Sequence, residues 1–172
     1  SAGLPVADNA PDFAASLGLG WNLGNTLDAT GAEDLTSEIS WGQPRAEKAL
    51  FEYLRSQGFS SVRIPVSWGQ HTDADYNIDP EWMARVTEVV DYAIDSGLYV
   101  IINSHHDCDK YYPNDDHADE SERYIKAVWT QIADNFADYD STLIFESMNE
   151  PRLMGTSIEW WFRDDDEKGI AS

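Results

Sequence analysis

Apolar and polar positions follow one another along the chain with two different periods, one typical of strands and one typical of helices. The strand-like segments are short apolar or alternating stretches. They lie near residues 17–24, 59–66, 98–103 and 142–148. Because Leu143, Ile144 and Phe145 follow one another without a polar residue, we predict that the last of these strands is buried on both faces.

Three segments between these strands carry apolar residues at helical spacing. The first begins near Pro44, which suits the first turn of a helix, and ends at Gly58. The second begins at the capping pair Asp79-Pro80 and ends at Gly97. The predicted buried faces are Ala46, Ala49, Leu50, Tyr53 and Leu54; Met83, Val86, Val89, Val90, Ala93 and Ile94; and Ile125, Val128, Trp129, Ile132, Ala133 and Phe136. Residues 1–16 show no clear period, and we interpret them as a lead-in to the first strand.

The order of these segments predicts an α/β fold. Strand and helix alternate, and the strands begin about forty residues apart, which is typical of βαβ units and a parallel sheet. No linker-like segment interrupts this order, so we expect a single domain over residues 1–172. A barrel of this type needs eight strands to close. We therefore predict the N-terminal half, about four βα units, of a (β/α)8 TIM barrel.

Composition narrows the classes of partner. Hydrophobic residues make up 42% of the chain, too many for a disordered protein, and no apolar run approaches the ~20 residues of a membrane span. Thirty-two acidic against eleven basic residues give a net charge of -21, which repels nucleic-acid phosphates and anionic membranes. We therefore expect neither as a partner. Seven Trp and eight Tyr offer flat faces on which sugar rings stack, besides their use in the core.

The last predicted strand leads directly into polar residues. Asn149 and Glu150 follow it, and Pro151 has no N–H with which to extend a ladder of strand hydrogen bonds. In a parallel barrel the carboxyl ends of the strands carry the chemistry. On its own, this motif favours a loop in which Glu150 caps a helix or pairs with Arg152, and only the rest of the chain changes that interpretation.

Polar or aromatic residues also lie near the ends of the other predicted strands. A carboxylic acid beside imidazoles and a guanidinium suits acid–base chemistry, because charge and burial set its pKa. Each residue also has a structural alternative, such as an ion pair for Arg63, a core position for Trp68 and a satisfied buried histidine for His105. Together with Asn149 and Glu150, the candidates are Asn22, Arg63, Trp68, His105 and His106.

The segment from His105 to Asp109 also contains metal-binding side chains. Imidazole, thiolate and carboxylate all bind zinc, and the lone Cys108 excludes a multi-cysteine site and an intrachain disulfide. Adjacent residues of an extended chain point in opposite directions, so His105 and His106 are not expected to share an ion. We predict no metal and no other cofactor, with metal-dependent hydrolysis as the weaker alternative.

These motifs resemble glycoside hydrolase family 5, the cellulase family of eight-stranded barrels, and within it the endoglucanase and xyloglucanase branch. Four separate stretches in family order carry the resemblance. They are GWNLGNTLD at residues 20–28, GFSSVRIPVSW at residues 58–68, IINSHHD at residues 101–107 and FESMNEPR at residues 145–152.

The resemblance implies a role for each candidate residue. Glu150 would be the general acid/base, and Asn149 would hold the C2 hydroxyl of the sugar being cleaved. Arg63 would brace the nucleophile, and His105 would line the cleavage subsite. His106 and Asn22 would contact the neighbouring sugar on the non-reducing side, with Trp68 as a weaker candidate for the same wall. Such enzymes are retaining, act on β-glucan, and use a second carboxylate roughly 5 Å from the first.

The sequence departs from the family pattern in one respect. In the family, the nucleophile is a glutamate of the seventh strand. Glu159 and Glu167 of this chain come too soon after the fourth strand to be that residue. We therefore expect the acid/base half of a secreted endo-β-1,4-glucanase, with any signal peptide removed, nearly inactive alone and completed by its missing C-terminal half. The alternative is a non-catalytic half-barrel that binds glucan or assembles with a second copy of itself.

Overall fold

The structure is a computed structural model that describes residues 9–156 and 159. Its helices and strands alternate as predicted, with three short 3-10 helices in the loops. In chain order the elements are α1 (Ala10–Ser16), β1 (Gly20–Asn22), η1 (Leu35–Ile39), α2 (Lys48–Ser56), β2 (Ser61–Ile64), η2 (Gly69–His71), α3 (Pro80–Asp95), β3 (Tyr99–Asn103), η3 (Asp115–His117), α4 (Ala118–Asn135) and β4 (Leu143–Glu146).

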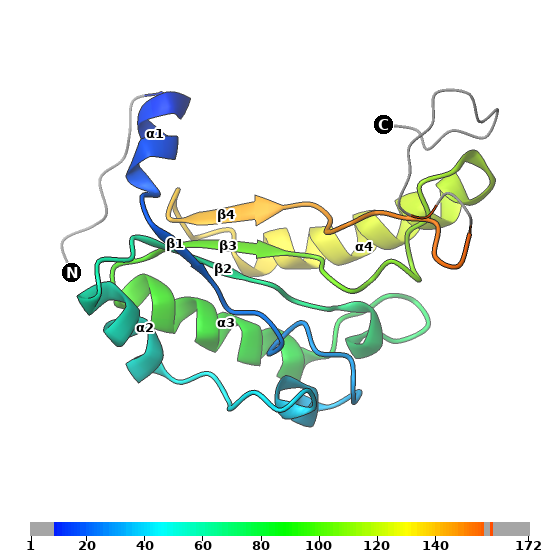
Figure 1. Ribbon diagram of the computed structural model, residues 1–172. Helices are drawn as coiled ribbons and strands as arrows, with labels where there is room; N and C mark the ends of the chain where they lie inside the picture. The colour runs from blue at the N-terminus through cyan, green and yellow to red at the C-terminus, as the bar shows by residue number, and fades with distance from the viewer. Residues whose placement is uncertain (1–8, 157–158, 160–172) are drawn as a thin grey trace.

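The four strands form one parallel sheet in the order β1-β2-β3-β4, which confirms the predicted fold class. Helices α2, α3 and α4 cover one side of this sheet, while α1 stands at the amino ends of the strands (Figure 1). The apolar set of β2 faces the helices, since Val62 and Ile64 are fully buried in the core. The alternate set, which includes Arg63, faces the other side of the sheet.

The predicted helix boundaries are correct for α3 but not for α2. Asp79 caps α3 by accepting a hydrogen bond from the Glu81 N–H, at 2.7 Å. Helix α2 begins at Lys48, so Pro44 lies outside it. The reason is that Ala46 has other partners: its N–H donates to Glu38 and its carbonyl accepts from Arg85, at 2.7 Å in both cases.

Several predicted core positions are wrong. Ala49, Tyr53 and Ala133 are exposed, whereas Phe51 and Tyr124, which were not predicted to be buried, lie in the core. The predicted face of α3 is correct at Val86, Val89, Val90 and Ala93, whereas those of α2 and α4 are correct only in part.

Strand β4 is not buried on both faces. Phe145 is 44% exposed although its ring contacts Trp129 of α4, because no further strand or helix covers β4 among the described residues.

The N-terminal segment is not a plain lead-in. Residues 10–16 form α1, which Asn9 caps by accepting from the Asp12 N–H at 3.0 Å. The Phe13 ring packs edge-on against Tyr99 with 5.7 Å between centroids, so α1 covers the amino end of β3. Residues 1–8 lie outside the described part. No helix among the described residues has the length and apolar character to cross a membrane.

Candidate active site

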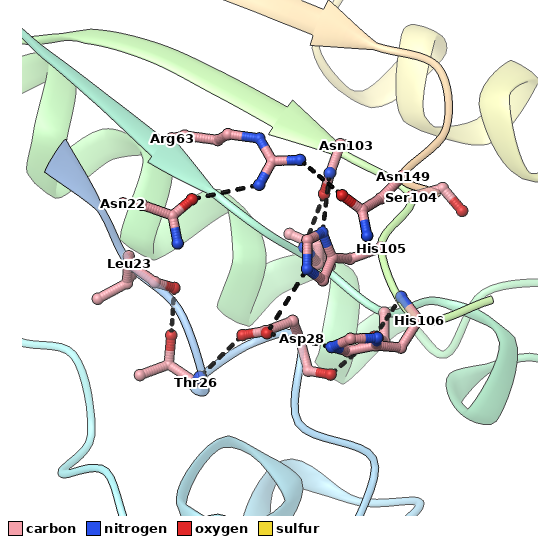
Figure 2. Close-up of polar contacts among 12 residues, drawn as sticks. Asn22, Leu23, Thr26, Asp28, Arg63, Asn103, Ser104, His105, His106 and Asn149 are labelled. Carbon is pink, nitrogen blue, oxygen red and sulfur yellow. Dashed lines mark hydrogen bonds and ion pairs between the residues drawn. The ribbon is translucent and has the colours of Figure 1, made fainter. Parts of the chain in front are cut away.

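The register of the sheet brings polar side chains to one side at the carboxyl ends of the strands. Asn22 of β1 pairs with Arg63 of β2, and Asn103 of β3 pairs with Glu146 of β4. Paired residues of neighbouring parallel strands point to the same side of a sheet. Figure 2 shows Asn22, Arg63, Asn103, His105 and Asn149 converging there.

Arg63 is the centre of this group. Its Nε and Nη2 donate to the two carboxylate oxygens of Glu146 at 2.7 and 2.5 Å, a bidentate pairing. Nη2 also donates to Asn149 Oδ1 at 3.0 Å, and Nη1 donates to Asn22 Oδ1 at 3.2 Å. The hydrogen bond from Arg63 lowers the pKa of the Glu146 carboxyl below its ordinary value. Arg63 therefore fixes side chains from three strand ends in one network.

Glu146 and Asn103 extend this network beyond the residues expected from the sequence. Asn103 Nδ2 donates to Glu146 Oε1 at 3.1 Å and lies 3.0 Å from His105 Nδ1. Both are polar residues of strands, and the two-residue period of a strand puts their side chains on the same side of the sheet as Arg63. That period was the available signal for them, and the sequence reasoning did not use it.

His105 and His106 lie together beside a buried carboxylate, Asp28. Asp28 Oδ2 is 3.9 Å from His105 Nε2 and 3.6 Å from His106 Nε2. Burial alone would raise the pKa of Asp28, but hydrogen bonds from His106 and from the Thr26 N–H outweigh it and lower that pKa. Burial and the neighbouring His106 lower the pKa of His105 to about 4, so His105 is neutral at pH 7.

From the sequence we expected the two imidazoles to point in opposite directions, but in the structure they lie together. The chain has left β3 at Asn103 and turns, so the rings meet edge to face with 4.5 Å between centroids. Asp28, His105 and His106 each offer one ligand atom, and these atoms lie within 4.8 Å of one another. This spacing is compatible with a metal ion, so geometry alone does not exclude the metal alternative.

Asn149 and Glu150 lie at the same end of the sheet. The Asn149 N–H donates to the Ser104 carbonyl at 2.8 Å, and its carbonyl accepts from the Tyr111 hydroxyl at 3.0 Å. Glu150 is exposed and has a φ of 45°, in the left-handed region that residues with side chains rarely adopt. The loop alternative of an ion pair with Arg152 receives no support, since Arg152 Nη1 donates to Glu159 Oε1 at 2.6 Å.

Trp68 lies in the core of the structure. Its side chain is fully buried, and its indole N–H donates to the Asn103 carbonyl at 2.9 Å. The backbone N–H groups of Trp68 and Gly69 donate to the buried Asp107 carboxylate at 3.0 and 2.8 Å. These contacts favour the structural alternative for Trp68, whose backbone and side chain hold the loop that follows β2.

A cavity of about 630 Å³ lies beside His106. Trp41 borders it and is 44% exposed, with its ring centroid 5.3 Å from that of His106. The remaining lining is mainly hydrogen-bonding side chains, among them Glu33, Gln70 and Lys110. An exposed aromatic ring beside polar groups offers a ligand both an apolar face and hydrogen-bond partners.

Fold and site together define the class of protein: part of a parallel α/β barrel with an ionisable polar cluster at the carboxyl ends of its strands. The family model for cellulase (glycosyl hydrolase family 5) matches residues 26–171, and the chain belongs to that family.

Relatives of known activity and structure agree. The chain is 49% identical over 154 residues to Endoglucanase A of Ruminococcus albus, covering 88% of this chain and 42% of that protein. Among solved structures, the catalytic domain of CelCCA matches with a TM-score of 0.89 and 46% identity, covering 96% of this chain and 45% of that one. A family 5 lichenase from Caldicellulosiruptor sp. F32 matches with a TM-score of 0.90 and 40% identity, covering 96% of this chain and 46% of that one. The chain thus spans about two fifths of the length of such curated relatives.

Proposed function

We propose that this chain supplies the acid/base half of the active site of a retaining endo-β-1,4-glucanase, as a single partial catalytic domain over residues 1–172. The observation that carries the proposal is the joint placement of Asn22, Arg63, His105 and Asn149 at one end of the sheet, within one hydrogen-bonded group. Glu150 directly follows Asn149, so its carboxylate belongs to the same end.

In this proposal Glu150 donates a proton to the leaving sugar oxygen and later accepts one from water. Its positive φ supports the assignment, because strained backbone is concentrated at functional sites. Asn149 accepts from Arg63 through Oδ1, which leaves Nδ2 as a donor for the C2 hydroxyl of the sugar. His105 lines the cleavage subsite, and His106 with Asn22 contacts the next sugar.

The nucleophile is proposed to come from sequence outside this chain. Neither Glu159, which binds Arg152, nor Glu167, which lies outside the described residues, is assigned to it. Arg63 uses four of its five N–H donors on Asn22, Glu146 and Asn149, so one Nη1 hydrogen remains to brace an incoming carboxylate.

The proposed substrate is a polymeric β-glucan. One family 5 neighbour with a TM-score of 0.84 is described as a xyloglucan-specific endo-β-1,4-glucanase in complex with cellotriose, and another with a TM-score of 0.89 as a lichenase mutant with cellotetraose. The cavity beside His106 and the exposed Trp41 ring offer room for a chain that extends past the cleavage subsite. Because such polymers do not enter cells, the protein is proposed to act after secretion.

The test is substitution of Glu150 in the full-length protein. Glu150→Gln is expected to lower kcat/KM on carboxymethylcellulose or xyloglucan by about 10²–10⁴-fold, the usual contribution of general acid–base catalysis. A cellobioside with a dinitrophenyl leaving group needs little protonation, so Glu150→Gln should lower the rate of its glycosylation step much less. In Glu150→Ala, azide should restore turnover and give a β-glycosyl azide.

The matched control is Glu52→Gln, which removes an exposed carboxylate on α2, far along the chain from the site. It should leave the rate on every substrate unchanged. Full activity of Glu150→Gln on polysaccharide would show that the acid/base assignment is wrong.

A second candidate is a non-catalytic half-barrel that binds glucan or pairs with a second copy. The exposed Phe145 and the sheet edges at β1 and β4, unpaired among the described residues, favour it, since an open edge is a template for another strand. Sizing the purified 172-residue chain and titrating it with cellotetraose in a calorimeter tests this candidate. A monomer without glucan binding would rule it out.

A further inference from the structure

The side-chain amide of Asn103 has only one chemically possible orientation. Its Oδ1 accepts from the Val66 N–H at 3.2 Å, and its Nδ2 faces Glu146 Oε1 at 3.1 Å. Reversing the amide would place two hydrogen-bond donors together at Val66 and two acceptors together at Glu146. Asn103 is fully buried, so water does not compensate for such a mismatch.

This orientation determines which nitrogen of His105 carries the proton. Asn103 Nδ2 has two hydrogens; one is directed to Glu146, and the other faces His105 Nδ1 at 3.0 Å. His105 Nδ1 must therefore accept, and the single proton of the neutral ring lies on Nε2. The backbone of His105 is fixed as well, because its N–H donates to the Val66 carbonyl at 2.8 Å.

We propose that Asn103 is a positioning residue that holds His105 in the tautomer with its proton on Nε2, so that His105 presents a hydrogen-bond donor to the cleft. Glu146 takes part by holding the Asn103 amide in place, and Arg63 in turn holds Glu146. The Nε2–H group would donate to a sugar oxygen in the cleavage subsite. That contact rests on the proposed function, whereas the tautomer of His105 does not.

The same inference decides against a metal ion at Asp28, His105 and His106. A metal bound at His105 Nε2 requires the ring proton on Nδ1, where it would oppose the Asn103 N–H. Metal-binding histidines usually donate their second N–H to a carboxylate or carbonyl, whereas here the second nitrogen faces a donor. His105 is therefore expected to donate to substrate rather than to bind zinc.

The test reads the tautomer by NMR, without reference to activity. Long-range proton–nitrogen correlation spectra of the full-length protein with labelled histidine report which ring nitrogen is protonated, and His105→Gln assigns the His105 signals. The native protein should show His105 protonated on Nε2 at pH 7. Zinc chloride at stoichiometric concentration should leave those signals in place.

Asn103→Asp provides the matched variant. The new carboxyl group keeps an acceptor for the Val66 N–H, and it shares one proton with Glu146, because two carboxyl groups in direct contact do not both ionise. That proton lies between the two carboxyl groups and leaves no hydrogen for His105, so the ring proton should move to Nδ1. On glucan, kcat/KM should then fall on the order of tenfold, the size expected for one lost hydrogen bond. A folded Asn103→Ala, checked by circular dichroism, should show a mixture of the two tautomers.

Three results would overturn the proposal: a native His105 with its proton on Nδ1, an Asn103→Asp variant whose tautomer is unchanged, or displacement of the His105 Nε2 signal by zinc. If the NMR results are as expected but the native protein does not cleave glucan, the proposed function fails while the role of Asn103 stands.

Discussion

His71 is a buried histidine outside the proposed site. It is 3% exposed, and its ring stacks on Trp82 with 3.6 Å between centroids. Burial lowers its pKa to about 4, although the charges of Asp34 and Asp79 act in the opposite direction. His71 therefore folds as the neutral ring, and its protonation opposes folding.

This residue predicts a pH dependence of stability. Because the pKa of His71 is about 4 in the folded protein and about 6.5 unfolded, the unfolded chain binds the proton first, and stability falls as the pH drops from 6.5 towards 4. The loss is on the order of 3 kcal/mol at the low end. Urea unfolding across this range measures it. His105 contributes a parallel loss, since its pKa is also about 4.

In His71→Gln, the free energy of unfolding should depend less on pH, by the contribution of one proton. The contribution of His105 should remain. The control is His117→Gln, which replaces an exposed histidine and leaves the burial of His71 unchanged, so the contribution of His71 to the pH dependence should remain. An unchanged slope in His71→Gln would contradict the assignment of a buried, neutral His71.

At the scale of elements, a buried ion pair holds the loop between β1 and α2 onto α3. Glu38 of η1 is 1% exposed and accepts from Arg85 of α3 at 2.9 and 2.7 Å. Arg85 is 4% exposed and also pairs with Glu88. Through Ala46, this pair also determines where α2 begins. The same loop carries Asp28 and Trp41, so the pair also supports the cleft.

We expect Glu38→Gln to destabilise the protein by about 3–5 kcal/mol, because it leaves the buried Arg85 charge without its main partner. Denaturant unfolding measures the change. The control is Glu88→Gln, which removes the partner that is half exposed and should cost much less. Equal effects of the two substitutions would show that the burial of Glu38 does not determine the loss in the free energy of unfolding.

The sequence predicted elements well where a local signal marked them. Asp79 and Pro80 begin α3, and Gly97, with a φ of 82°, follows its end. It failed where a distant residue decided the local structure. Ala46 looks helical by its spacing, but Glu38 and Arg85 occupy its backbone groups. No local pattern reports such a contact.

At the scale of the whole molecule, the parallel order of the strands placed four of the candidate residues at one end of the sheet. Asn22, Arg63, His105 and Asn149 do lie together. The chemistry among them was not predictable in the same way. The period of the strands places Glu146 and Asn103 on the same side as Arg63, but their hydrogen bonds depend on the register between strands. The contact of Asp28 with the histidines depends on the turn after β3, which has no local signal in the sequence.

The net charge of -21 belongs to the whole molecule and predicts its response to salt. Like charges repel more strongly in the compact state than in the unfolded chain, so screening should stabilise the fold. The screening length falls from about 30 Å at 0.01 M salt to about 10 Å at 0.1 M. Exposed pairs such as Lys48 with Asp95 are also weakened, but surface pairs contribute little to stability.

We therefore expect the melting temperature to rise from 0.01 M to about 0.5 M sodium chloride, a range over which the screening length becomes shorter than the molecule. Asp134 and Asp138 offer a matched test, because both are exposed, and negative charge near the C-terminus of a helix also opposes the helix dipole. Asp134 lies in the last turn of α4, and Asp138 lies just beyond its end. The double variant Asp134→Asn, Asp138→Asn should be more stable at low salt and respond less to added salt. A native melting temperature that falls with salt would mean that ion pairs outweigh the repulsion.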